Sequence, residues 1–224
     1  MKVIARIHNA YDEKFGVPRQ SGLAEEVEST LVFEPEYRAE EALRGIEEFS
    51  HLWLIWAFDR TERETWSPTV RPPRLGGNQR VGVFATRSPF RPNAIGLSCV
   101  KLLGKEKTRE GTVLKVAGAD LMNGTPIYDI KPYLPYADCK PEATGGFTDR
   151  TEKRTAEVVF SENAKGKLSP KEEEALKSVL KEDPRPAYQE DPEREYGFSF
   201  GGKEIRFKVR GHVLTVTGIL DGSR

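Results

Sequence analysis

The chain has 224 residues, and its 35 lysines and arginines balance its 35 aspartates and glutamates, so that the formal net charge is zero. A neutral chain is not a globally basic nucleic-acid coat. The longest apolar run, Leu52–Phe58, has seven residues, whereas a membrane-spanning helix needs about 20. The N-terminus has no signal-peptide pattern, and Cys99 and Cys139 have no metal-like spacing, so we expect a cytoplasmic protein.

The charges are unevenly distributed along the chain. Residues 25–48 contain nine glutamates and two arginines, whereas residues 65–105 contain seven basic side chains and no acidic one. The basic stretch is rich in arginine, proline and glycine, which is typical of a rigid loop that meets phosphate or carboxylate groups. The alternative is that the acidic stretch packs against the basic one within the fold.

Strand patterns dominate the first 136 residues. Apolar alternation predicts a strand at 2–7, and the continuous apolar run predicts a buried strand at 52–58. A helix is predicted at 36–48, where apolar residues recur at helical spacing and glutamates fill the other face. Further strands are predicted at 81–85, 95–103, 112–117 and 126–130. Such short spacing between strands favours a closed or sandwiched sheet.

The composition changes after Tyr136. Residues 138–154 are polar and contain a Gly-Gly pair, which is typical of a linker. Beyond it, Ser169-Pro-Lys-Glu172 is a capping box that predicts a helix ending before Asp183. Strands are predicted at 155–160, 196–200, 204–209 and 212–219. The expected fold is therefore mainly β (α+β), with an N-terminal domain at 1–136, a linker at 137–154 and a small α+β domain at 155–224.

Several widespread functional motifs are absent from the sequence. It contains no G-x-G-x-x-G after a strand, no phosphate-binding P-loop, no H-E-x-x-H and no C-x-x-C. Rossmann-type nucleotide binding and a structural zinc are therefore disfavoured, and we expect no metal. The three histidines lie far apart without a serine elbow, which disfavours a Ser-His-Asp hydrolase.

Four polar loops, each stiffened by proline or glycine, carry the candidate functional side chains. They are residues 15–20, 85–93, 120–133 and 183–188. Proline fixes the backbone beside arginine, amide or carboxylate groups, so these groups are presented in a set direction. A structural interpretation also exists, since an Asn-Gly hairpin is structural in most proteins and Asp129 with Lys131 can be a solvent-facing pair.

Blocks in these loops and between them closely resemble the TrmO (TsaA-like, formerly VirR/YaeB) family. The Arg-Pro-Pro-Arg-Leu-Gly-Gly sequence is very specific. The blocks that carry the resemblance are 15–20, 49–53, 69–78, 81–93, 123–126, 129–133 and 183–188.

The resemblance implies an S-adenosylmethionine-dependent tRNA methyltransferase that acts on N6 of the threonylcarbamoyl-modified adenosine at position 37. It further implies an N-terminal β-barrel that binds the methyl donor without a Rossmann fold, and a small C-terminal domain. A homodimer with each donor site near the subunit interface is also implied.

The resemblance also implies a set of residues that contact the methyl donor. Asp59 and Arg60 follow the tryptophan-bearing strand, and His51 is an alternative on that strand. The implied donor contacts are Pro18, Arg19, Gln20, Asp59, Arg60, Arg87, Leu97, Ala117, Gly118, Ala119 and Asp120.

Methyl transfer from a sulfonium requires positioning of the nucleophile and no metal. Because the acceptor N6 is acylated, its lone pair is poor and its proton must leave, so a positioned base is expected. Asp129 and Asp120 are the candidates, with Asp129 preferred if Asp120 binds the donor ribose, and Lys131 and Tyr133 lie beside Asp129 in the sequence. A base supplied by the substrate's own carboxylate is the alternative.

The expected tRNA contacts come from the arginine-rich loops. Arginine binds phosphate or the threonyl carboxylate, and Tyr133 or Tyr188 can stack on an unpaired base. The candidate tRNA-binding residues are Arg71, Arg74, Arg91, Asn93, Arg185 and Tyr188. Two other functions are compatible with the sequence, namely a non-catalytic tRNA- or nucleotide-binding module and a methyltransferase with a different acceptor.

Overall fold

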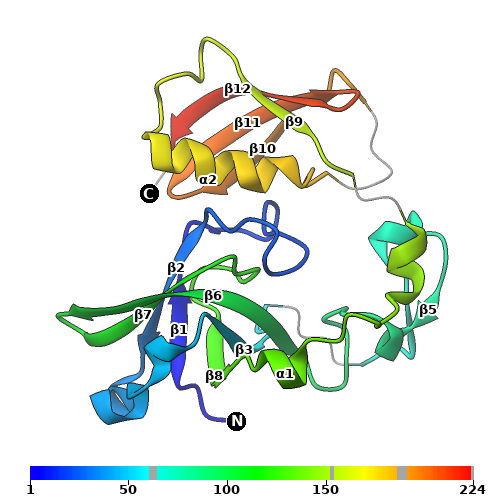
Figure 1. The fold of residues 1–224 in the computed structure, drawn as a ribbon. Helices are drawn as coiled ribbons and strands as arrows, with labels where there is room; N and C mark the ends of the chain where they lie inside the picture. The colour runs from blue at the N-terminus through cyan, green and yellow to red at the C-terminus, as the bar shows by residue number, and fades with distance from the viewer. Residues whose placement is uncertain (61–64, 152–153, 186–190, 223–224) are drawn as a thin grey trace.

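The described part of the protein, taken from a computed structural model, forms two larger β-sheets and a two-stranded one. The described residues are 1–60, 65–151, 154–185 and 191–222. One large sheet is built from strands between residues 5 and 132, and the other from strands between residues 157 and 221 (Figure 1). The mainly β composition agrees with the prediction.

The first sheet closes on itself. Its strands are β1 (Ala5–His8), β2 (Glu28–Phe33), β3 (His51–Ala57), β6 (Ile95–Thr108), β7 (Gly111–Ala117) and β8 (Pro126–Pro132). They are hydrogen-bonded in the order β1-β2-β7-β6-β3-β8, and β8 pairs again with β1. All neighbours in this six-stranded ring are antiparallel.

The inner face of the ring is the first hydrophobic core. Along β3, Leu52, Leu54 and Trp56 point inward and are buried, whereas Trp53 and Ile55 are only partly buried on the outer face. β3 was predicted correctly because both of its edges are paired, to β6 and β8, which favours a continuous apolar sequence. β2 was not predicted, because its residues overlap the glutamate-rich stretch.

The helix predicted at 36–48 is wrong. This segment forms three short 3-10 turns, η1 (Pro35–Tyr37), η2 (Glu40–Leu43) and η3 (Ile46–Glu48). Ala39 is extended with ψ of 123°, and Gly45 has φ of 81°, so both junctions leave the helical region. The apolar spacing in the sequence therefore reflects separate turns packed over the ring.

The segment between β3 and β6 is an arm with little regular structure. Of the strand predicted at 81–85, only β5 (Val81–Gly82) pairs, with β4 (Thr69–Val70), and η5 (Val83–Ala85) follows as a 3-10 turn. A further turn, η4 (Pro73–Leu75), ends at Gly76.

The segment predicted as a linker contains two short helical pieces. They are the end of α1 (Pro135–Asp138) and the 3-10 turn η6 (Gly146–Arg150). In α1, Asp138 accepts hydrogen bonds from the Trp53 indole and the Leu134 backbone, at 3.1 and 2.8 Å. These bonds attach the beginning of the segment to the outer face of the ring.

The second sheet is covered by one helix. Its strands, in spatial order, are β10 (Tyr196–Phe200), β11 (Lys203–Arg210), β12 (Val213–Asp221) and β9 (Glu157–Phe160), with β9 parallel to β12. The helix α2 (Pro170–Lys181) buries Leu176, Val179 and Leu180 against the sheet. The predicted capping box is confirmed, because Ser169 and Glu172 exchange both hydrogen bonds.

The loop between β1 and β2 joins the two sheets. In Figure 1 this blue segment lies between the ring and the second sheet. Tyr11 forms a β-bridge with Phe200, and the Asp12 carboxylate accepts from the Gly202 N–H at 2.9 Å. Ala24 and Val27 belong to the hydrophobic core of the second sheet. The N-terminal loop is therefore part of the C-terminal core.

We predict that Gly96→Ala destabilises the protein, because a Cβ at Gly96 overlaps the buried Trp56 ring. Overpacking of this kind costs about 1–3 kcal/mol. Urea unfolding should show this loss of free energy. The control is Gly218→Ala in β12, where an added Cβ meets no heavy atom within 4 Å. Equal stability of the two variants contradicts the prediction.

A second prediction concerns the ion pair of Asp183 and Arg185. Two hydrogen bonds of 2.8 Å join the side chains, which are only 8% and 9% exposed. Asp183→Ala leaves the guanidinium buried without its partner, at a cost of about 3–5 kcal/mol. Thermal unfolding should show a lower Tm for this variant and a partial recovery when Arg185→Met is added. A single variant as stable as the parent contradicts this expectation.

Candidate functional site

The wall of the ring is interrupted between β6 and β7. The β6–β7 ladder begins at the pair Lys101–Ala117, and within the described residues the preceding part of β6 has ladder partners on β3 alone. Beyond Ala117, Gly118 has φ of 75° and turns the chain away from β6. We call this break in the β6–β7 ladder, between residues 95–100 and residues 118–120, the opening.

The segment that follows the predicted Pro-Arg-Gln motif bridges this opening. The Cys99 N–H donates to Ser21 Oγ at 3.2 Å, and the Gly22 N–H donates to the Gly118 carbonyl at 2.8 Å. These bonds satisfy backbone groups that the interrupted ladder leaves unpaired. As a result, residues 20–22 lie between β6 and the end of β7.

Asp120 is held at the inner side of the opening. Ser98 Oγ donates to Asp120 Oδ1 at 2.5 Å, and the Trp56 indole N–H donates to Ser98 Oγ at 2.9 Å. Burial raises the pKa of the Asp120 carboxyl. The hydrogen bonds from Ser98 and the backbone of Ser21 lower it, as does the positive charge of Arg87, but burial is the largest effect. The carboxylate thus joins three segments of the chain.

Cationic side chains gather beside the bridging segment. Gln20 Oε1 accepts from Arg87 Nη1 at 2.5 Å, and Arg19 Nη2 donates to the Arg185 carbonyl at 3.2 Å. Burial lowers the pKa of the Arg19 guanidinium. The positive charges of Arg74 and Arg154 lower it further, whereas the negative charge of Asp183 raises it. Three of the four predicted loops therefore meet here, with guanidinium groups suited to a carboxylate or phosphate.

Most of the predicted donor-contact residues surround this opening. The contacts above link Gln20, Arg87 and residues 117–120. Pro18, two residues before Gln20 in the sequence, is buried. Leu97 precedes Ser98 and is 54% exposed on the outer face of β6.

The other implied donor contacts lie around the hairpin turn and the outer face. Arg60 donates to the Asn123 carbonyl at 2.9 Å, and the neighbouring Asp59 is exposed. His51 packs edge-on against Tyr133 on the outer face. Neither position is joined by a hydrogen bond to Gln20, Arg87 or Asp120 among the described residues.

The two candidate bases lie on opposite faces of the sheet. In the strand register, Asp129 on β8 lies opposite Ile55 on β3, and Ile55 lies opposite Leu97 on β6. Two strand spacings separate Asp129 from Leu97 by about 10 Å on the outer face. Asp120, in contrast, binds the inward-facing Ser98. The structure therefore does not bring the two carboxylates together.

Asp129 and its neighbours remain accessible on the outer face. The Asp129 side chain is 46% exposed, and its Oδ2 lies 3.0 Å from Lys131 Nζ. The Tyr133 ring contacts the Trp53 ring at a centroid distance of 5.8 Å. A carboxylate, an ammonium group and aromatic rings are thus presented together.

The candidate tRNA-binding residues differ in their surroundings. Arg71 and Asn93 are exposed, and Arg74 is partly exposed in η4. Arg91 donates to the carbonyls of Val83 and Thr86, at 3.1 and 2.7 Å, and so holds the arm together. Arg185 is engaged by Asp183, and Tyr188 lies outside the described residues.

Three residues of this site were missed by the sequence reasoning, namely Ser21, Trp56 and Ser98. A signal for Ser98 exists, because it is a polar residue at an inward position of β6, between the buried Gly96 and Val100. Its alternation with Leu97 and Cys99 predicts a buried hydroxyl that needs a partner.

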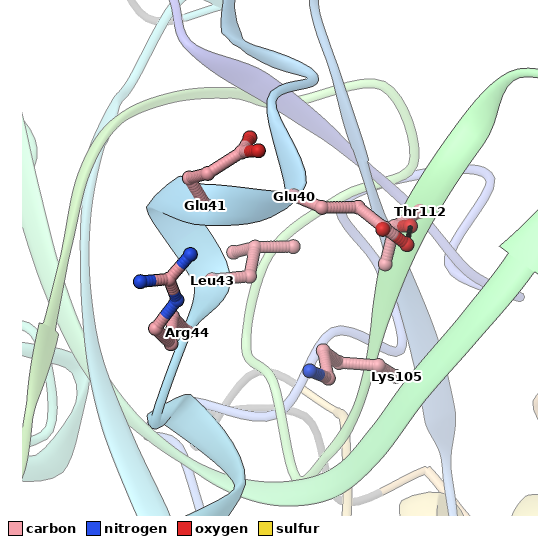
Figure 2. A pocket seen from close by; sticks show the side chains of 6 residues that line it. All are labelled: Glu40, Glu41, Leu43, Arg44, Lys105 and Thr112. Carbon is pink, nitrogen blue, oxygen red and sulfur yellow. Dashed lines mark hydrogen bonds between the residues drawn. The ribbon is translucent and has the colours of Figure 1, made fainter.

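A surface hollow of about 270 Å³ lies elsewhere, under η2 (Figure 2). Its lining residues are Glu40, Glu41, Leu43, Arg44, Lys105 and Thr112. Glu40 also pairs with Lys107 at 2.9 Å, and Lys105 with Glu47 at 2.8 Å. The acidic stretch therefore does pack against basic side chains of β6, but none of the predicted site residues lines this hollow.

Two absences apply to the described ranges only. They contain no group of three or more His, Cys, Asp or Glu side chains arranged to hold a metal ion. Nor do they contain a helix of the length and apolar character needed to cross a membrane.

Comparison with known proteins identifies both parts of the chain. Residues 6–139 match the family model of the tRNA-methyltransferase O N-terminal domain, and residues 153–222 match that of the TrmO C-terminal domain. A tRNA (adenine(37)-N6)-methyltransferase of Escherichia coli K12 is 43% identical over 214 residues, which cover 92% of this chain and 91% of the relative.

Further relatives support the same assignment. A tRNA (adenine(37)-N6)-methyltransferase of Eikenella corrodens is 40% identical over 172 residues, which cover 77% of this chain and 97% of the relative. A crystal structure of TrmO from P. aeruginosa superposes with a TM-score of 0.80 at 33% identity, covering 99% of this chain and 97% of that one. The chain belongs to the TrmO family.

Proposed function

We propose that this chain is an S-adenosylmethionine-dependent tRNA methyltransferase that methylates N6 of adenine 37 in its threonylcarbamoyl-modified form. The observation that carries the proposal is the 43% identity to the E. coli enzyme over 92% of the chain. We further propose a division into a donor-binding β-barrel domain at 1–136, a linker at 137–154 and a small domain at 155–224.

The residues around the opening fit the methyl donor by their chemistry. Arg87 and Arg19 offer guanidinium groups for its carboxylate, and Asp120 offers an acceptor for its ribose hydroxyls. The exposed Leu97 side chain offers an apolar contact for the adenine. When bound, S-adenosylmethionine supplies the methyl group, and its sulfonium sulfur is the leaving group.

The chain's own residues contribute positioning and proton removal. Asp120 also binds Ser98 and the backbone of Ser21, and these contacts fix its carboxylate in position for the donor ribose. Asp129 is exposed on the same outer face as Leu97, so we assign it as the base that accepts the N6 proton. Lys131 and Tyr133 lie beside it to orient the acceptor.

Arg71 and Arg74 are proposed to contact the anticodon loop, whose phosphates attract arginine. The Arg185 guanidinium is held by Asp183 and is not among these contacts. We also propose a cytoplasmic homodimer. The dimer is supported by Ile95 and Leu103, which are 36% and 45% exposed along β6, since such apolar surface favours a protein interface.

Single-turnover transfer of labelled methyl from S-adenosylmethionine tests the function directly. We expect label on tRNA that carries the threonylcarbamoyl group and none on the same tRNA without it. Donor binding that is unaffected by either RNA, with no label transferred, supports a different acceptor. RNA binding without donor binding contradicts methyl transfer and supports a binding module.

The roles of the two carboxylates can be separated by substitution. Asp129→Asn should lower the single-turnover rate by about 10²–10⁴-fold, because a general base is lost, and leave donor affinity unchanged. Asp120→Asn should weaken donor binding, measured by calorimetry. The control is Asp221→Asn, whose side chain is 99% exposed at the end of β12. An unchanged rate in Asp129→Asn refutes the assignment of the base.

A further inference from the structure

Two large aromatic rings lie together on the surface of the arm. Trp66 is 50% exposed and Phe84 is 70% exposed, and their ring centroids are 6.1 Å apart with planes inclined by 30°. A single exposed aromatic residue is common, but a stacked pair is costly to leave in water and is typical of a binding surface. Neither residue belongs to the donor-binding or base-bearing groups described above.

The backbone of the arm fixes this pair in place. Trp66 precedes β4 and Phe84 follows β5, and the register Thr69–Gly82 aligns the two strands. The Val83 N–H donates to the Pro68 carbonyl at 2.9 Å, next to both rings. Since these bonds hold the backbone on both sides of the pair, the two segments that carry the rings do not have to be brought together when a ligand binds.

A guanidinium group completes the platform. Arg91 lies 5.6 Å from the centroid of the Phe84 ring, within cation–π distance. It also donates to the carbonyls of Val83 and Thr86, which sets its position. Arg80 donates to Thr69 at 2.7 Å on the neighbouring strand.

The composition of residues 65–105, which carry both rings, favours one class of occupant. Residues 65–105 contain no acidic side chain, and the arm presents Arg71, Arg74, Arg80 and Arg87 in addition to Arg91. Such a surface repels a basic partner and attracts a polyanion. Exposed rings beside arginines combine base stacking with phosphate contact, which is the pattern that binds unpaired nucleotides.

We propose that Trp66 and Phe84 form a stacking platform for an unpaired base of the RNA substrate. The proposal rests on the proposed tRNA methyltransferase function and adds residues to it, since Tyr133 and Tyr188 are the stacking candidates indicated by the sequence. The platform selects looped over paired RNA, because only an unpaired base exposes its faces. The neighbouring arginines bind phosphates of either form.

The test uses the full chain and two RNA probes, an unmodified anticodon stem-loop and a blunt duplex with the same number of phosphates. Phe84→Leu and Trp66→Leu keep apolar volume and remove the aromatic faces. We expect each to weaken stem-loop binding by about 5- to 100-fold and to leave duplex binding unchanged. The dependence of affinity on salt should keep its slope, because no phosphate contact is removed.

Two further variants make the test specific to stacking. Phe84→Tyr retains an aromatic ring and should restore stem-loop affinity. Tyr136→Leu, on α1 and 85% exposed, is the matched control and should bind both probes as the parent does. Arg71→Ala should weaken both probes and reduce the salt slope.

Two results overturn the platform. One is unchanged stem-loop affinity in both leucine variants, and the other is an equal loss of stem-loop and duplex affinity. In the first case, a changed sedimentation coefficient of the leucine variants supports a protein interface at the two rings instead. Methyl transfer by the parent protein is scored separately. If the parent protein transfers methyl and the leucine variants bind the stem-loop as the parent does, the platform alone is refuted. If the leucine variants lose their preference for the stem-loop but the parent transfers no methyl, the proposed function alone is refuted.

Discussion

The interrupted ladder between β6 and β7 is the constraint on which the rest of the site depends. A closed sheet has no free edge, so its backbone groups are satisfied by neighbouring strands. Here the chain turns away at Gly118, and Ser21 and Gly22 supply hydrogen bonds where ladder partners are missing. The opening therefore leaves few backbone polar groups without a hydrogen-bond partner. It lies where the Asp120 carboxylate and the Gln20–Arg87 pair meet.

The same loop that fills the opening also completes the second sheet. Tyr11, Ala24 and Val27 are buried in the C-terminal core, while Ser21 and Gly22 bridge the opening. Folding of the C-terminal half thus fixes both ends of the segment that shapes the proposed donor side. This shared loop gives a physical reason for the two parts to occur together in one chain.

The sequence was informative where local and tertiary preferences agree. The apolar run of β3 and the Ser169–Glu172 capping box each have one structural solution, and both predictions are confirmed.

The prediction of a helix at 36–48 is wrong because apolar residues spaced among glutamates also suit separate 3-10 turns. The left-handed conformation of Gly45 cannot be told from the sequence. The gathering of Arg19, Gln20 and Arg87 was anticipated only through family resemblance, since their contacts span 67 and 166 positions. That Asp120 and Asp129 face opposite sides depends on the turn at Gly118, which breaks strand alternation.

The bond from Arg19 to the carbonyl of Arg185 has a consequence for how the two halves evolve. A main-chain acceptor is present whatever side chain occupies the position, so this contact does not require a particular residue at 185. It does require the direction of the carbonyl, which follows from the left-handed turn at Asp183, with φ of 43°. Few residues other than glycine, asparagine and aspartate adopt that conformation readily. The junction therefore depends on the backbone path at Asp183 in addition to the Asp183–Arg185 ion pair, and it does not tolerate an insertion or a β-branched residue at the turn itself.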